Sequence, residues 1–190
     1  MLRPEIQRPT ELPVNVAYVK AQAVVDFADD DDFLNESILD AVDYLDGYDG
    51  ILGRALMDQT VVQKMPNFSD MRLPYGAATS ITSVTYFDTL GVAQTVSAED
   101  YILLNDQNGS RMHFLSDSQL PAVFDRPDAV VVTYQAGWAT ADDVPAPITK
   151  AIVMMISGWY ENRTGMTDTG LKEAPYGVRD MLAPYRKDGV

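Results

Sequence analysis

The stretch GILGRALMDQTVVQKMPNF, residues 50–68, changes character halfway along its length. Leu52 and Leu56 continue the three- and four-residue spacing of apolar side chains that begins at Leu34, which predicts an amphipathic helix reaching Leu56. From Thr60 onward the residues are β-branched and predict a strand. No residue at the switch marks catalytic chemistry. We therefore expect a protein in which a β-rich part directly follows a helical part along the chain.

The helical part is predicted on both sides of this switch, over residues 13–57 and 142–187. Residues 14–25 form a first helix of about three turns, and the second helix follows. Its buried stripe comprises Leu34, Ile38, Ala41, Val42, Leu45, Tyr48, Leu52 and Leu56. A third helix is predicted to begin with Asp142 or Asp143 as its N-cap and to end at Gly165. Its buried side chains are Ile148, Ile152, Met155, Ile156 and Trp159. A short last helix breaks at Pro184.

The β-rich part is predicted over residues 58–141, as short strands separated by turn residues. The expected strands are residues 60–65, 80–88, 92–96, 100–105, 111–115 and 129–137. Short strands at this spacing favour an antiparallel sheet. The predicted fold class is thus α+β, a small helical bundle with an inserted antiparallel β-rich subdomain. Residues 1–12 are predicted to be a mobile arm, and residues 188–190 a tail.

Composition excludes several classes of protein. The chain has 190 residues, no cysteine, one histidine and a net charge of −14. These counts exclude a disulfide framework, thiolate chemistry and a multi-histidine metal site. The longest apolar run has about 5 to 6 residues, against the ~20 that span a bilayer, so we expect a soluble protein. The acidity argues against binding nucleic acid through its phosphates.

The acidic segment Asp29–Asp32 directly precedes the second helix. Carboxylates at this position complement the helix dipole and can cap free N–H groups, which is the first interpretation. A calcium-binding loop is the alternative, but it requires acids at alternate positions around a central glycine, and no such glycine is present.

No catalytic motif is recognisable. The sequence has no glycine-rich phosphate loop, and His113, the only histidine, lies within a predicted strand. Asp168-Thr169-Gly170 matches the tripeptide of aspartic proteases, but its neighbours are polar. We predict no catalytic residue, no metal and no cofactor. Two alternatives stay open, a hydrolase that uses two carboxylates and a monomeric binding module on a β platform.

Several stretches, in order, resemble the head–tail connector proteins, or adaptors, of long-tailed phages and related gene transfer agents. The matching residues are Gly53, Arg54, Leu56, Gln59, Thr60, Ser83, Val84, Tyr86, Asp88, Gly91, Tyr134, Ala136, Gly137, Trp138, Val144, Pro145, 160–163 and 182–186. The match covers residues 14–187. It departs from the family at Tyr48-Asp49-Gly50 and over residues 164–175.

The resemblance implies a structural virion protein in the neck of a phage-like particle, assembled in the host cytoplasm. Connector subunits form a ring, commonly of twelve copies, beneath the portal. The ring extends the DNA channel, through which DNA passes without specific binding, and it presents a platform to the tail-proximal stopper. A ring subunit needs contact surfaces and no active site, which accounts for the missing motifs. No membrane partner is implied.

Three groups of residues are candidates for the contacts of such a ring. The basic C-terminal segment Pro184, Tyr185, Arg186 and Lys187 is the candidate portal-binding site, and its removal is expected to leave the fold intact. The acids Asp29, Asp30, Asp31 and Asp32 are candidates to face the channel, because four adjacent acids are hard to neutralise within one subunit. Arg54, Tyr160, Glu161 and Arg163 are the candidate subunit interface.

Overall fold

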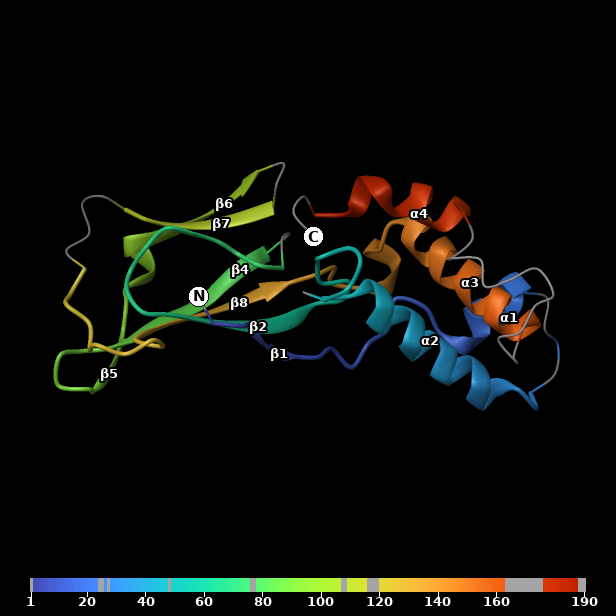
Figure 1. The fold of residues 1–190 in the computed structure, drawn as a ribbon, viewed down its shortest axis with the longest axis horizontal. Coiled ribbons are helices and arrows are strands. Elements are labelled where there is room, and N and C mark those ends of the chain that lie inside the picture. Colours follow the sequence, from blue (N-terminus) through green and yellow to red (C-terminus); the bar gives the residue numbers. More distant parts are fainter. Residues whose placement is uncertain are drawn as a thin grey trace. The chain divides into compact units, whose positions relative to one another are not determined.

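A computed structural model of the chain contains helices and antiparallel sheets, which confirms the predicted α+β class (Figure 1). The structure describes residues 2–23, 26, 28–47, 49–75, 78–106, 109–115, 120–162 and 176–187. The chain divides into two compact units. We call Met1–Pro9 with Asp58–Gly137 the β unit, and Thr10–Met57 with Trp138–Val190 the helical unit.

The β unit is built from two antiparallel sheets. The larger has the order β1-β2-β8-β4-β5, with β1 (Glu5–Gln7), β2 (Gln59–Met65), β8 (Val130–Ala136), β4 (Ala78–Phe87) and β5 (Ala93–Thr95). The smaller has the order β3-β7-β6, with β3 (Met71–Arg72), β7 (Gly109–Phe114) and β6 (Tyr101–Asp106). All six strands predicted from the sequence are confirmed. Residues 5–7, predicted within a mobile arm, instead pair with β2, because Glu5–Gln7 align with Thr60–Val62.

Aromatic side chains join the two sheets of the β unit. Phe68 packs edge-on against Tyr86 of β4 and Phe114 of β7, with ring centroids 5.4 and 5.3 Å apart. The backbone N–H of Ala78 donates to the hydroxyl of the buried Ser110 over 2.7 Å. The β6–β7 hairpin lies beside β4 (Figure 1), and alternate residues of β7, namely Ser110, Met112 and Phe114, are buried.

The helical unit is organised around α3 (Ala146–Glu161), which contacts α1 (Val16–Ala23), α2 (Asp31–Leu45) and α4 (Tyr176–Leu182). Its core includes the predicted stripe residues Leu34, Ile38, Leu45, Ile148, Ile152 and Ile156. Trp159, predicted to be buried, is 38% exposed. The predicted helix end at Gly165 lies outside the described residues.

The prediction that the second helix reaches Leu56 is wrong, because α2 ends at Leu45. Gly47 takes a left-handed φ of 82°, which a helix cannot accommodate. The chain then folds back, with the backbone N–H of Leu52 donating to the Leu45 carbonyl over 3.3 Å. Leu52 and Leu56 are nevertheless fully buried, so the apolar spacing correctly identified core residues in what proves to be a loop.

Candidate interaction surfaces

The acidic segment is held at the start of α2. Asp30 is the N-cap residue, and Asp31 and Asp32 occupy the first turn, where their charge complements the helix dipole. The expectation that these carboxylates also cap free N–H groups is wrong for Asp30, whose side chain makes no capping hydrogen bond. Its carboxylate has a partner elsewhere in the unit.

Two of the four acids interact within the subunit. Oδ2 of Asp30 accepts a hydrogen bond from the Tyr160 hydroxyl over 2.7 Å, and Asp31 forms an ion pair with Lys20 over 2.7 Å. Asp29 and Asp32 are exposed. The argument that four adjacent acids are hard to neutralise within one subunit therefore fails for Asp31, which has an ion pair, and is weakened for Asp30, which has a hydrogen bond.

Arg54 lies in the loop between α2 and β2 and is half-buried. Its guanidinium carbon is 5.7 Å from the centre of the Trp138 ring, within the range of a cation–π contact. The Nε atom is buried and has no hydrogen-bond partner among the described residues. Burial lowers the pKa of Arg54 from its ordinary value. The structure thus shows a charged side chain with an unmet hydrogen bond.

Two of the other candidate interface residues, Tyr160 and Glu161, lie at the end of α3. Tyr160 is half-buried, since its hydroxyl bonds to Asp30 and its ring lies 6.1 Å from that of Phe33. Glu161, the last residue of α3, is exposed. Arg163 and the 168–170 tripeptide lie outside the described residues. Within the described residues, no hydrogen bond or ion pair joins Arg54 to this end of α3.

The C-terminal segment is bound to its own helical unit. Ala183–Tyr185 form a 3-10 turn after α4, and Tyr185 packs against the core. The Arg186 Nε donates to the Ile51 carbonyl over 3.1 Å, and the Lys187 backbone N–H donates to the Leu52 carbonyl over 2.9 Å. Pro184 and Arg186 remain exposed. These contacts argue against the expectation that removal of the segment leaves the fold intact.

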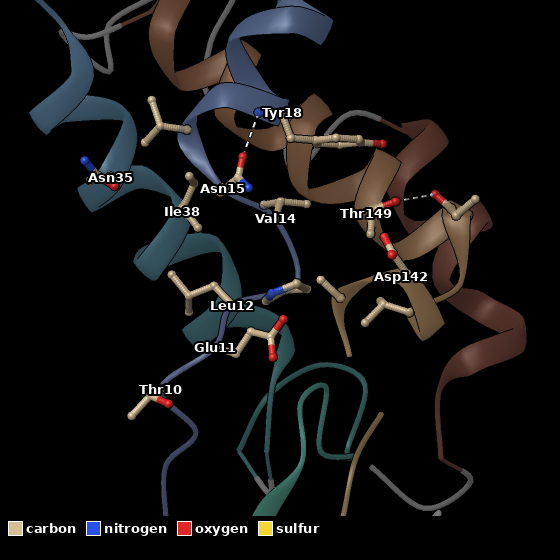
Figure 2. A pocket seen from close by; sticks show the side chains of 15 residues that line it. Thr10, Glu11, Leu12, Val14, Asn15, Tyr18, Asn35, Ile38, Asp142 and Thr149 are labelled. Atoms are coloured by element: carbon tan, nitrogen blue, oxygen red, sulfur yellow. Dashed lines mark hydrogen bonds between the residues drawn. The ribbon is translucent and has the colours of Figure 1, made fainter. Parts of the chain in front are cut away.

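A groove of about 610 Å³ in the helical unit was not predicted from the sequence (Figure 2). It is lined by residues 10–16 and Tyr18, by Asn35 and Ile38 of α2, and by residues at the start of α3. The lining comes from segments more than a hundred positions apart in the chain, so no local pattern could have revealed it.

His113, the single histidine, serves a structural contact in the β unit. Its ring forms a hydrogen bond with the Asp70 carboxylate, which also accepts from the Phe114 backbone N–H over 3.1 Å and from Arg111 over 3.0 Å. Partial desolvation raises the pKa of Asp70, but the hydrogen bonds from His113 and Phe114 outweigh it and lower the pKa overall. The contact ties residue 70 to β7.

No group of three or more His, Cys, Asp or Glu side chains in the described part of the chain is arranged to hold a metal ion. Within the same residues, every helix is too short or too polar to cross a membrane.

Comparison with known proteins gives a result at the level of the fold. Neither protein-family models nor curated proteins match the sequence. A chain in the neck of an empty gene transfer agent particle, computed with C6 symmetry, is similar with a TM-score of 0.76 and 20% identity, over 98% of this chain and 97% of that one. A chain in the neck of the native particle, computed with C12 symmetry, gives 0.70 and 18%, over 100% and 97%.

A chain in the virion of a native gene transfer agent particle gives a TM-score of 0.75 and 20% identity, over 97% of this chain and 96% of that one. These three similarities extend over both units and leave no large part of either chain unmatched. Over nearly its whole length, this chain has the fold of a chain found in the neck of gene transfer agent particles.

Proposed function

We propose that this chain is a head–tail connector, a structural subunit in the neck of a phage-like particle. The observation that carries the proposal is the likeness to a gene transfer agent neck chain, with a TM-score of 0.76 over 98% of this chain. The resemblance of sequence motifs to the head–tail connector family supports the same proposal. This resemblance depends on residue identities and is therefore separate from the structural similarity. A neck subunit works through its surfaces, so the proposed role includes no catalytic step.

The proposed assembly is a ring of identical subunits, commonly twelve in this family, beneath the portal. The similar neck structures were computed with C6 and C12 symmetry, and rotational symmetry of this kind places identical chains around one axis. DNA would pass along that axis, and a net charge of −14 per chain disfavours its retention on phosphate-binding sites. The portal and a tail-proximal stopper are the proposed neighbours along the axis.

Contacts between subunits are proposed at Arg54 and at Glu161, together with Arg163. A closed ring joins two different patches of neighbouring subunits, so a cation and an exposed carboxylate on separate patches suit it. Arg54 offers a half-buried charge whose Nε is buried and unbonded in the described chain. Tyr160 would contribute its ring alone, because its hydroxyl already binds Asp30.

Contact with the portal is proposed at the C-terminal turn. Tyr185 packs against its own core, so the exposed surface of Pro184 and Arg186 would carry this contact. Arg186 presents a guanidinium, which binds carboxylates through paired hydrogen bonds. Of the four candidate portal-binding residues at 184–187, the proposal therefore keeps the two exposed ones, Pro184 and Arg186.

The test is co-expression with the portal protein of the same particle, followed by cryo-EM of the purified complex. We expect a ring of this chain on the portal, and particle necks that lack this chain would contradict the proposal. Arg186→Gln should weaken the complex, whereas Lys150→Gln removes an equal charge from an exposed position of α3 and should not. Circular dichroism checks that both variants are folded.

A further inference from the structure

The groove in the helical unit is lined by buried apolar residues and by exposed polar ones (Figure 2). Its buried residues include the apolar Val14, Ile38 and Val144, with exposed fractions of 4%, 1% and 5%. Its volume of about 610 Å³ lies within the range of roughly 300–1,000 Å³ typical of ligand sites. Apolar surface of this kind gains free energy when another apolar group covers it.

The groove is poorly suited to a small polar ligand. Such ligands are oriented by a few buried polar groups at fixed positions. Among the described lining residues, Thr149 is the only buried polar one, and its hydroxyl already donates to the Ala146 carbonyl over 3.1 Å. The remaining polar lining residues are exposed at the edges, where they would meet the flanks of a longer segment.

Two carboxylates stand at the edges of the groove, one from each side. Glu11 belongs to the segment that precedes α1, and Asp142 belongs to the 3-10 turn before α3 (Figure 2). Both are exposed, and neither has a hydrogen bond or ion pair within the described chain. The amide of Asn35 on α2 is exposed as well. An occupant with a positive charge would pair with these carboxylates.

A second copy of this chain is a poor source of that charge. Each copy carries a net charge of −14, so bringing two copies together adds repulsion. Much of the basic side-chain set already pairs with carboxylates of its own chain, namely Lys20, Lys64, Arg72, Arg111 and Arg126. A different protein, which does not add a further charge of −14, is therefore the more favourable source of the cation.

We propose that this groove docks a segment of a different protein that carries a bulky apolar side chain next to a lysine or arginine. The apolar side chain covers Val14, Ile38 and Val144, and the cation pairs with Glu11 and Asp142. The inference rests on the proposed neck function only for the partner's identity, which would be a neighbouring neck or tail protein. The binding chemistry can be measured on the isolated chain.

The experiment is an NMR titration of the ¹⁵N-labelled full chain with blocked hexapeptides. The probe GRLWKG combines apolar and basic residues, GELWEG reverses its charges, and GRSSKG removes its apolar side chains. We expect GRLWKG to shift the amide signals of Val14, Asn35 and Thr149 saturably. GELWEG and GRSSKG should bind at least about tenfold more weakly, since each loses one half of the interaction.

A charge variant and a matched control complete the test. Glu11→Gln with Asp142→Asn should weaken GRLWKG binding by roughly three- to tenfold, as expected for two exposed ion pairs. Glu36→Gln with Asp40→Asn removes the same charge from exposed positions of α2 outside the groove and should leave binding within about twofold. The spectra themselves show whether each variant is folded.

Three outcomes would overturn the inference: equal binding of GELWEG, equal loss in the control variant, or shifts away from the groove. A fourth is movement of the groove signals when the chain alone is concentrated, since the occupant would then be a second copy. A chain that binds GRLWKG in the groove but forms no ring on the portal would contradict the proposed function and leave this inference standing.

Discussion

The Tyr160 hydroxyl, in the last turn of α3, donates a hydrogen bond to Oδ2 of Asp30, the residue that precedes α2, over 2.7 Å. The tyrosine ring also lies 6.1 Å from Phe33 in the first turn of α2. The Tyr160 side chain thus connects the end of α3 to the start of α2. It also supplies a hydrogen bond to one carboxylate of a crowded acidic segment, where repulsion would otherwise act against the fold.

Replacing Tyr160 by phenylalanine removes this hydrogen bond and keeps the ring. We expect the free energy of unfolding to fall by about 1–2 kcal/mol, as for a hydrogen bond to a charged acceptor that is partly exposed. Urea denaturation measures the change. Tyr44→Phe is the control, because Tyr44 is 43% exposed on α2 and its hydroxyl has no hydrogen bond within the described chain. Equal losses in both variants would mean that the Asp30 contact contributes nothing.

The loop after α2 shows what sequence periodicity can and cannot predict. Burial of Leu52 and Leu56 follows from their apolar spacing, and the structure confirms that both are in the core. Their helical conformation does not follow, because Asp46 and Gly47 start a turn. The Asp46 Oδ1 accepts from the Leu56 backbone N–H over 2.6 Å, a contact across ten positions that periodicity does not contain.

Long-range pairing explains the other differences. The β2, β4 and β8 strands carry strong local signals and were predicted, whereas Glu5–Gln7 become a strand only because β2 offers a free edge. In the same way, the sequence shows four adjacent acids but not that Lys20 and Tyr160 lie beside two of them. The groove is a third case, since its lining exists only after the helices have packed.

Gly50 has no room for a side chain. A Cβ atom there would lie 2.1 Å from the Asp46 carbonyl oxygen and 2.5 Å from that of Leu45, and neither backbone atom can move without breaking the turn. We expect Gly50→Ala to lower the free energy of unfolding by about 3 kcal/mol. The measurement is chemical denaturation followed by circular dichroism.

Gly158 provides the matched control for this substitution. It lies inside α3, and a Cβ atom there would meet nothing within 4 Å. Gly158→Ala should therefore raise the free energy of unfolding by up to about 1 kcal/mol, because alanine restricts the unfolded chain and favours helix. Effects of the same sign and size at both positions would contradict the proposed crowding at Gly50.

The Asp70 cluster predicts a specific dependence on pH. The folded pKa of Asp70 lies below its ordinary value of 3.8, since hydrogen bonds from His113 and Phe114 outweigh the effect of burial. The ionised form is thus favoured by folding, and its contribution to stability is complete above the unfolded pKa and is lost as the pH falls through the folded one.

Unfolding of the native chain and of Asp70→Asn, measured at several pH values, tests this assignment. The native chain should be the more stable at neutral pH, and the difference should shrink below about pH 4. The control is Asp58→Asn, an exposed carboxylate elsewhere in the β unit. A difference for Asp70→Asn that stays constant down to pH 2 would rule out a titrating Asp70 contact.

Truncation of the C-terminus tests whether this segment stabilises the fold or serves only as a docking tail. Deleting residues 184–190 removes the packing of Tyr185 and the hydrogen bonds that Arg186 and Lys187 make to residues 51 and 52. We expect a loss of about 2 kcal/mol in the free energy of unfolding. Deleting residues 188–190 alone is the control and should cost far less. A stable 184–190 deletion would instead restore the view that this segment is a separable tail.

The charge of the acidic segment yields the last prediction, which depends on the proposed ring. Carboxylates that face the channel are repeated around it and repel the phosphates of passing DNA, within about one Debye length, ~8 Å at physiological salt. Asp29 and Asp32 are the exposed members, whereas Asp30 and Asp31 bind Tyr160 and Lys20, so changing those two would confound charge with stability. Particles that carry Asp29→Lys with Asp32→Lys should assemble and eject DNA slowly, and the delay should shrink as salt rises. Normal ejection at low salt, with rings intact, would place both acids away from the channel.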